Sequence, residues 1–403
     1  MGLFDKLAFI SQARQALEEM GIDPFNVEIQ KILSPTEARI AGRKVLLAGT
    51  NNYLGLTFDP RCIEAACQAT RSEGTGTTGS RTANGTFAGH RALERELAEF
   101  FGCAKAIVFS TGFVANLGVI STLTGPGDTL IIDGDSHASI YDGCRMGGAD
   151  ILRFRHNDTA DLEKRLRRLG DRTKNTLVIV EGIYSMLGDR APLAEIVSLK
   201  KQYGFWLMVD EAHSLGVLGQ NGRGLAEECG CMDDVDFIIG TFSKSLGAIG
   251  GFCVSNHPEL DLVRYASRSY LFTASPSPAT IASVRRALQI LAAGTDLRER
   301  LWANAHRLYE GLSELGYRLG PEPTPVVAVH MGSKEETLAC WKELLESGIY
   351  VNLVWPPAAP KGESLLRCSV SAAHTEEQIE RLLTAFAELA HRSAAPPSPD
   401  THE

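Results

Sequence analysis

Residues 206–244 read WLMVDEAHSLGVLGQNGRGLAEECGCMDDVDFIIGTFSK and contain two short apolar runs. Asp210 directly follows the run Trp206–Val209, and Lys244 comes shortly after the run Phe237–Ile239. Continuous apolar runs of this length are typical of strands in a parallel sheet that is covered on both faces. One αβ crossover separates the two runs, so we expect neighbouring strands. Asp210 and Lys244 would then lie close together at the ligand-binding edge of the sheet.

The same pattern continues on both sides of this stretch. Between about residues 46 and 275, apolar runs alternate with patterns of helical period, which predicts an α/β fold with a mostly parallel sheet. The further strands are expected at Ala106–Phe109, Thr129–Ile132, Leu177–Val180 and Gly251–Val254.

Length and composition predict a globular protein with several domains. The 403 residues are 44% hydrophobic and 22% charged, and such a length suggests about two to three domains. We expect an N-terminal arm over 1–45, a large domain over 46–290, a smaller α+β domain over 291–392 and a disordered tail over 393–403. The pattern Thr375-x-x-Gln378 predicts a capping box at the last helix.

Charge and cysteine content exclude several classes of protein. A net charge of −9 argues against a dedicated nucleic-acid binder, which needs a basic excess. The 9 cysteines are dispersed and form neither a metal-type C-x-x-C pair nor a disulfide framework, so we expect a cytoplasmic protein without a metal site. No apolar run reaches about 18 residues, so no transmembrane segment is expected. The N-terminus also lacks the apolar core of a signal peptide.

Residues Gly74–Gly79 match G-x-G-x-x-G, the fingerprint of dinucleotide-binding proteins. That fingerprint follows a strand and opens a helix. Here a helical pattern precedes the glycines and a loop pattern follows them. A glycine-rich loop that lets another backbone segment or a ligand come close is therefore the better interpretation. An NAD-dependent oxidoreductase is the weaker alternative.

Lys244 and Asp210 carry the strongest chemical signal. A lone lysine is usually a solvated surface group, but Lys244 lies between the hydroxyl residues Ser243 and Ser245 and follows an apolar strand. A partly buried lysine has a lowered pKa and can form a Schiff base with an aldehyde. Asp210 either caps a loop or pairs with the pyridine nitrogen of pyridoxal 5′-phosphate (PLP). His213 is close enough in the chain to reach the same cofactor.

Two further strand ends supply polar groups. Gly112, after the run that ends at Phe109, lies at the expected start of a helix, where free backbone amides bind anions. An ordinary tight turn would give the same pattern. His137 follows another strand and could stack on a cofactor ring, although a lone histidine is more often a structural residue. Together these residues predict a PLP site. They offer a lysine for the aldehyde, a partner for the pyridine nitrogen, a site for the phosphate and an imidazole that stacks on the ring.

At these residues the sequence resembles the fold-type I PLP enzymes, and among them the α-oxoamine synthases. The resemblance covers about residues 35–392 and rests on the motifs Asn52–Gly55, Gly74–Arg81, Glu181–Asp189 and Thr241–Lys244. The sequence is most similar to the bacterial members that acylate serine. That closer similarity rests on Thr57–Pro60, Asp135–Gly143, Phe154–Asn157, Gly251–Pro258, Phe272–Ser275 and Leu365–Ser369.

The resemblance implies a seven-stranded sheet and a role for each matching residue. Lys244 would bind the aldehyde and move protons at Cα, Asp210 would pair with the pyridine nitrogen and His213 would bond the phenolic oxygen. His137 would stack on the ring and orient the substrate. Gly112, Phe113, Thr241 and Ser243 would bind the phosphate, with Ser185 also at the cofactor. Thr273 would reach the phosphate in the partner subunit of a homodimer, and Asn52, Tyr53 and Arg367 would bind the substrate.

The implied reaction joins L-serine to a long-chain acyl-CoA or acyl carrier protein thioester. Its product is 3-ketodihydrosphingosine, which begins sphingolipid synthesis. Peripheral contact of a cytoplasmic enzyme with the inner membrane stays open. So does the use of alanine or glycine with a shorter thioester, as in an 8-amino-7-oxononanoate synthase.

Two positions depart from the closer relatives. Trp355 precedes Pro356 where those enzymes have an arginine that helps to handle the carboxylate, and Thr78 stands where they have asparagine. The tryptophan is a neutral packing change, or it leaves carboxylate binding to Arg367 alone, or it changes the preferred amino acid.

Overall fold

The structure is a computed structural model that describes residues 2–19, 23–356, 358–359 and 362–393. Apart from Ser393, which ends the last helix, the expected tail over 393–403 lies outside the described residues.

The large sheet has seven strands in the order β4–β10–β9–β8–β7–β5–β6. β5 to β9 pair in parallel, whereas β10 runs antiparallel to both of its neighbours. The mostly parallel seven-stranded sheet is thus confirmed. The bounds are β4 Lys105–Phe109, β5 Thr129–Asp133, β6 Asp150–Phe154, β7 Thr176–Glu181, β8 Trp206–Asp210, β9 Phe237–Thr241 and β10 Gly251–Ser255.

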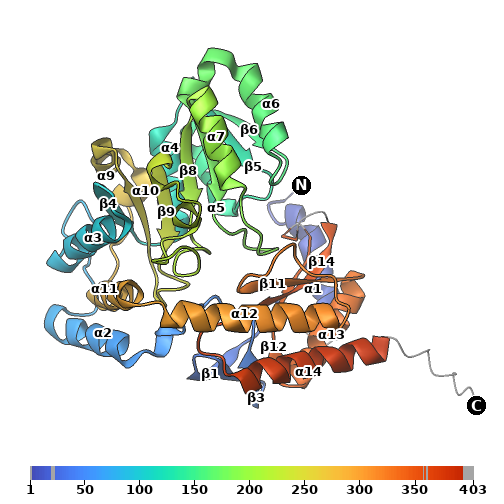
Figure 1. Ribbon diagram of the computed structural model, residues 1–403. Coiled ribbons are helices and arrows are strands. Elements are labelled where there is room, and N and C mark those ends of the chain that lie inside the picture. The colour runs from blue at the N-terminus through green and yellow to red at the C-terminus, as the bar shows by residue number, and fades with distance from the viewer. Residues whose placement is uncertain (1, 20–22, 357, 360–361, 394–403) are drawn as a thin grey trace, which may run out of the picture.

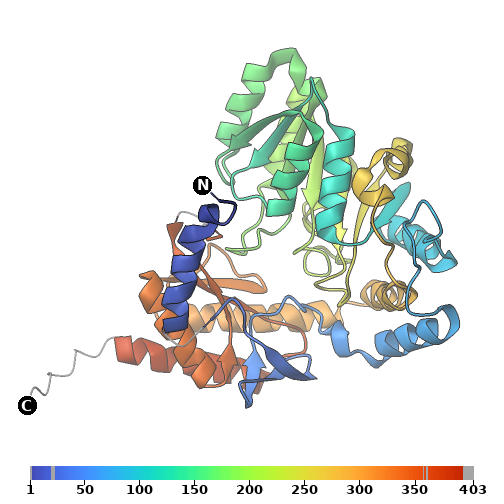
Figure 2. The same ribbon diagram turned by 180° about the vertical axis from the view of Figure 1, so that it is seen from behind.

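Apolar side chains project from both faces of the sheet, which explains why helices cover both faces. Successive side chains point to opposite faces, so Val178 joins one apolar cluster and Ile179 joins the other. Figure 1 shows α6 and α7 on the near face, and Figure 2 shows α4 and α5 on the opposite face. These helices are α4 Gly112–Leu123, α5 Ala138–Gly147, α6 Thr159–Leu169 and α7 Leu193–Tyr203.

The glycine-rich loop that begins at Gly74 connects two helices. It follows α2 (Pro60–Glu73) and leads to α3 (Ala88–Phe101). It therefore lacks the preceding strand of a dinucleotide fingerprint. Thr78 in this loop has a φ of 58°, a region that asparagine adopts more readily than a β-branched residue.

A second, smaller unit contains a three-stranded antiparallel sheet in the order β11–β14–β13. Its strands are β11 Val326–Met331, β13 Asn352–Val354 and β14 Ser364–Ser369, and its helices are α12 Asp296–Glu314, α13 Lys334–Glu346 and α14 Glu376–Ser393. The capping box is present, because the backbone N–H of Gln378 donates to Thr375 Oγ1 and that of Thr375 donates to Gln378 Oε1, each at 3.2 Å. α11 (Pro278–Ala293) leads from the large unit into α12 (Figure 1).

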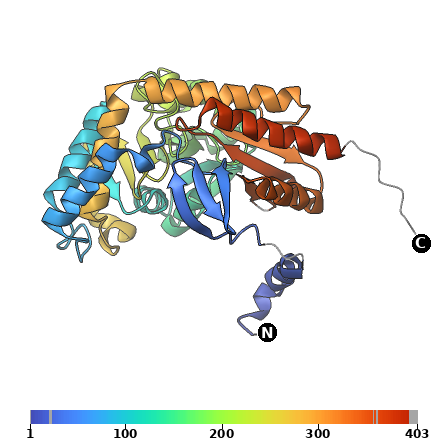
Figure 3. The ribbon, with the colours of Figure 1, turned by 90° about the horizontal axis from the view of Figure 1, so that it is seen from below.

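The N-terminal residues form a helix and a β-hairpin. α1 (Ala8–Glu19) lies beyond the hairpin strands in the view of Figure 3. β12 of the small unit extends the hairpin sheet by pairing in parallel with β3. The strands are β1 Ile29–Ser34, β2 Glu37–Ile40, β3 Arg43–Leu47 and β12 Ile349–Tyr350, and the short helices elsewhere are α8 Leu225–Glu228, α9 Val263–Ala266 and α10 Arg268–Leu271.

Within the described ranges, none of the helices combines the length and the apolar character that crossing a membrane requires.

Candidate active site

Four parallel strands of the large sheet end in a polar residue at the same edge. β5 ends at Asp133, β7 at Glu181, β8 at Asp210 and β9 at Thr241. The pairing of β7 with β8 sets Glu181 directly beside Asp210. Because ligands bind at the carboxyl ends of such strands, this edge is the candidate site.

A cavity of about 370 Å³ opens at this edge and reaches the N-termini of α4 and α5. The chain thereby gathers residues that the ends of five strands contribute, β4, β5, β7, β8 and β9. The predicted residues in its walls are Gly112, Phe113, His137, Asp210, His213, Thr241, Ser243 and Lys244.

Lys244 follows β9 and lies in a largely desolvated place. Burial lowers the pKa of its amine to about 8, although the nearby carboxylate of Asp210 counteracts this shift. At pH 7 about a tenth of the amine is therefore unprotonated, far more than for an ordinary lysine. An unprotonated amine is the form that attacks an aldehyde.

Asp210 lines the cavity and is held by two hydrogen bonds. Asn116 Nδ2 on α4 donates to Asp210 Oδ2 at 2.7 Å, and the backbone N–H of Ala212 donates to Oδ1 at 2.9 Å. Asn116 was not among the predicted residues. Its signal in the sequence is a single amide within the apolar first turns of α4, which is weak without knowledge of the helix orientation.

His213 and Tyr53 form a buried pair. The Tyr53 hydroxyl lies 2.7 Å from His213 Nδ1, and it donates to Asn51 Oδ1 at 3.3 Å. Burial and the positive charge of Lys244 hold the pKa of His213 well below its usual range, so the ring is neutral. Burial also raises the pKa of Tyr53 to about 12, which keeps the hydroxyl protonated.

His137 caps α5 at the rim of the cavity. Its Nδ1 lies 2.8 Å from Ser139 Oγ, and burial lowers the pKa of the ring while Asp210 opposes this. The backbone N–H of His137 donates to Glu181 Oε1 at 2.5 Å. Burial and the neighbouring Asp210 raise the pKa of Glu181 well above its usual range. Sequence reasoning gave Glu181 no role, although it ends an apolar strand just as Asp210 does.

The part of the cavity at the start of α4 is suited to an anion. The side chain of Thr111 caps α4 by accepting from the Val114 N–H, and the next backbone amides belong to Gly112 and Phe113. Such amides at a helix N-terminus attract negative charge. A Cβ on Gly112 would approach Thr241 Cβ to 2.9 Å, so only glycine lets the helix end come this close to β9.

Arg367 belongs to the small unit and is not among the residues that line this cavity. It lies on β14 with 4% of its surface exposed, and its Nε donates to Ser185 O at 2.6 Å. Its Nη2 donates to Asn51 Oδ1 at 3.2 Å. The expected neighbour Asn52 instead donates from Nδ2 to Thr57 Oγ1, so Asn51 is the direct partner that the motif alone did not identify.

A second cavity of about 400 Å³ adjoins the first and shares His137 with it. The segment after β5 forms one wall, and the loop after β7 forms another with Ser185 and Met186. The predicted Ser185 therefore lies beside the first cavity rather than in its lining.

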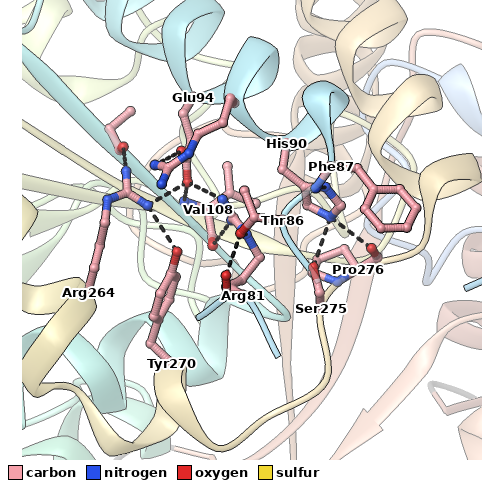
Figure 4. Close-up of polar contacts among 12 residues, drawn as sticks. Arg81, Thr86, Phe87, His90, Glu94, Val108, Arg264, Tyr270, Ser275 and Pro276 are labelled. Atoms are coloured by element: carbon pink, nitrogen blue, oxygen red, sulfur yellow. Dashed lines mark hydrogen bonds and ion pairs between the residues drawn. The ribbon is translucent and has the colours of Figure 1, made fainter. Parts of the chain in front are cut away.

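Thr273 is not among the residues that line either cavity. Its segment is anchored elsewhere, because the Ser275 N–H donates to Gly79 O at 2.9 Å and His90 Nε2 lies 2.9 Å from Pro276 O (Figure 4). The adjacent Phe272 has 79% of its surface exposed. The segment thus presents an apolar side chain to the outside of this chain.

The donor set of the first cavity fits PLP. An aldehyde requires an unprotonated amine, which Lys244 offers, and a protonated pyridine nitrogen requires an acceptor, which Asp210 offers. A phosphate requires amide and hydroxyl donors, which the start of α4, Thr241 and Ser243 offer. The three requirements are met in one cavity.

The model of the family described as aminotransferase class I and II matches residues 43–386. The chain belongs to this family. It is 56% identical over 389 residues to a serine palmitoyltransferase of Caulobacter vibrioides, with 96% of each chain covered. The predicted family and the fold-type I architecture are thus confirmed.

Solved structures of serine palmitoyltransferases agree with this assignment. That of Sphingomonas wittichii superposes with a TM-score of 0.96 at 50% identity, covering 98% of this chain and 100% of the other. That of S. paucimobilis with bound PLP–myriocin aldimine gives a TM-score of 0.95 at 48% identity, covering 97% and 99%.

Proposed function

We propose that this protein is a serine palmitoyltransferase that uses PLP. It would join the Cα of L-serine to the carbonyl carbon of palmitoyl-CoA and release CoA and CO₂, which leaves 3-ketodihydrosphingosine. The observation that carries the proposal is the convergence of Lys244 and Asp210 on one cavity, in a chain 56% identical to an enzyme of that name. When bound, PLP supplies the electron sink that stabilises negative charge at Cα.

In this proposal Lys244 moves the proton at the serine Cα. A general base works best when its pKa lies near the working pH, and the pKa of about 8 meets that condition. Asp210, fixed by Asn116, accepts the pyridine N–H. His213 bonds the phenolic oxygen, and His137 stacks on the ring and orients the substrate.

Other residues hold the two anionic groups. The amides of Gly112 and Phe113, with the Thr241 and Ser243 hydroxyls, bind the phosphate. The guanidinium of Arg367 binds the serine carboxylate through the two N–H groups that its bonds from Nη1 to Ser369 and from Nη2 to Asn51 leave free, because charge-assisted hydrogen bonds to a carboxylate are strong. Tyr53 and Asn52 complete the substrate pocket, and Ser185 positions Arg367 through its carbonyl.

Trp355 leaves carboxylate binding to Arg367 in this proposal. Its ring packs against Phe25 with centroids 5.4 Å apart in an edge-to-face arrangement, so it has an apolar role. Serine remains the proposed amino acid because the chain is 56% identical to a serine palmitoyltransferase. Arg367, oriented by Ser185 and Asn51, would hold the carboxylate that every amino acid carries.

We also propose that two chains form a homodimer with shared sites, in which Thr273 bonds the phosphate bound by the partner. Thr273→Ala is then expected to weaken PLP binding by about 10- to 100-fold, the effect of losing one hydrogen bond to a charged group. Titrating the cofactor-free protein with PLP and following its fluorescence measures this. Thr273→Ser keeps the hydroxyl and should bind nearly as the parent does. Unchanged affinity in the alanine variant would exclude the shared site.

The reaction itself is tested with purified, PLP-loaded protein, L-serine and palmitoyl-CoA. The expected result is 3-ketodihydrosphingosine, identified by mass spectrometry, with one CO₂ for each CoA. A shorter acyl thioester with alanine should react far more slowly. If that pair is preferred, the protein is another α-oxoamine synthase, such as an 8-amino-7-oxononanoate synthase. Parallel reactions with palmitoyl-acyl carrier protein identify the acyl donor.

The place of action that we propose is the cytoplasm. All nine cysteines are free in the structure, and most of them are buried as thiols within the core. Free thiols are typical of proteins from reducing compartments.

A further inference from the structure

His156, which lies in the turn between β6 and α6, bridges two buried carboxylates. Its Nδ1 lies 2.8 Å from Asp133 Oδ1, and its Nε2 lies 2.6 Å from Asp189 Oδ2. The three side chains are 16%, 0% and 8% exposed, and the ring of Tyr184 packs edge-on against the imidazole at 4.6 Å. Solvent is thus largely kept from both bonds.

The geometry requires a protonated ring. An ionised carboxylate only accepts hydrogen bonds, so both ring nitrogens must donate, and a histidine with two N–H groups is an imidazolium. Burial alone would lower the pKa of His156, but the bonds to Asp133 and Asp189 raise it to about 10. The bridge therefore stays charged across the physiological pH range.

The two carboxylates belong to different loops of the active-site edge. Asp133 ends β5 and starts the segment that leads to His137, whereas Asp189 closes the loop after β7 that carries Ser185. Asn157 reinforces the bridge: its backbone N–H donates to Asp133 Oδ2 and its Nδ2 donates to Asp189 Oδ2, each at 2.9 Å. One turn thus fastens both loops.

These loops are the two walls of the second cavity, and one of them holds Arg367. Ser136 and His137 line one side, and Ser185 and Met186 line another. The Ser185 carbonyl accepts from Arg367 Nε at 2.6 Å. A shift of the loop after β7 would therefore displace the guanidinium, and small displacements of a binding group are costly to catalysis.

We infer that His156 is a positioning residue, whose bridge between Asp133 and Asp189 sets the spacing of the His137 and Ser185 loops and thereby orients Arg367 toward the serine carboxylate. His156 lines the second cavity but not the first, where the proposed reacting groups lie. The inference rests on the proposed role of Arg367.

The test compares two isosteric variants of the PLP-loaded enzyme. In His156→Asn the amide nitrogen replaces Nδ1 and keeps the bond to Asp133, but the bond to Asp189 is lost, which leaves Asn157 as the contact of this turn with that carboxylate. In His156→Gln the amide nitrogen replaces Nε2 and keeps the bond to Asp189. We expect the dissociation constant of L-serine, measured by absorbance titration, to rise about tenfold in His156→Asn and about two- to threefold in His156→Gln. The affinity for PLP should stay within about twofold in both.

The following outcomes decide between these explanations. Unchanged serine binding in His156→Asn overturns the inference, and so does an equal loss of PLP affinity, because general loosening would then explain both. Asp189→Asn keeps an acceptor for Nε2 and should bind serine more tightly than Asp189→Ala; equal weakening also contradicts the inference. Arg367→Lys separates the two proposals. If it leaves serine binding unchanged, the role of Arg367 fails; if only Arg367→Lys weakens binding, the inference on His156 fails.

Discussion

Replacing Lys244 by alanine is expected to lower turnover of L-serine and palmitoyl-CoA by about 10³-fold or more. The variant loses both the amine that captures the aldehyde of PLP and the base that moves the Cα proton, and acid–base catalysis alone contributes about 10²- to 10⁴-fold. The cavity itself should persist, because Asp210 is held by Asn116 and the backbone of Ala212 rather than by the lysine.

Steady-state rates and the absorbance spectrum of the PLP-loaded protein measure this effect together. The parent should show an absorbance band that free PLP lacks, and the variant should lose it. Lys201→Ala is the control, since Lys201 lies on the surface of α7 with 65% of its side chain exposed and pairs with Asp234. An unchanged rate or band in Lys244→Ala would contradict the assignment of the lysine.

Replacing Glu94 by glutamine is expected to lower the free energy of unfolding by about 3–5 kcal/mol. Glu94 Oε1 accepts from Arg81 at 2.9 Å, from Arg264 at 2.8 Å and from the backbone N–H of Val108 at 3.1 Å (Figure 4). All three charged side chains are under 10% exposed. Glutamine would leave the buried guanidinium of Arg81 without a negative partner, and Arg264 with only the partly exposed Asp261.

Thermal and denaturant unfolding of the holoenzyme check this prediction. Glu96→Gln on the same helix is the matched control: Glu96 pairs with Arg285 at 2.6 Å, but the two side chains are 25% and 34% exposed. A partly solvated pair contributes at most about 1 kcal/mol. Equal losses of unfolding free energy in Glu94→Gln and Glu96→Gln would contradict the expectation that the buried cluster contributes more than the partly solvated pair.

The same carboxylate gives a pH dependence of defined sign. Burial would raise the pKa of Glu94, but Arg81 and Arg264 more than reverse this and hold it below its usual range. The stabilisation is therefore complete above the ordinary carboxylate pKa and is lost as the pH falls through the lowered value. Glu94→Gln should flatten the decrease in stability on acidification.

The sequence predicted the sheet because its central strands are buried on both faces and appear as unbroken apolar runs. β6 was missed for the opposite reason. Its residues Asp150 and Arg153 are exposed at the edge of the sheet, so the segment lacks both a continuous run and a clean alternation. A periodic apolar pattern arises from the burial of side chains, and few side chains of an edge strand are buried.

The site was predictable where chemistry follows a strand end, as at Asp210 and Lys244. It was not predictable where a residue's hydrogen-bond partner is distant in sequence and belongs to a residue type without distinctive chemistry. Asn116 lies 94 positions from Asp210, and His156 lies 33 from Asp189, and no local pattern links either pair. Such contacts depend on how helices and loops are placed, which a single sequence does not encode in its periodicity.

The central claim is tested most directly by a competition experiment. PLP-loaded protein receives palmitoyl-CoA with equimolar L-serine, L-alanine and glycine, and mass spectrometry quantifies the three condensation products. The account predicts that 3-ketodihydrosphingosine, the product from serine, is the main product and that Arg367→Lys lowers its yield. A larger yield from alanine or glycine, or no condensation at all, would contradict the account.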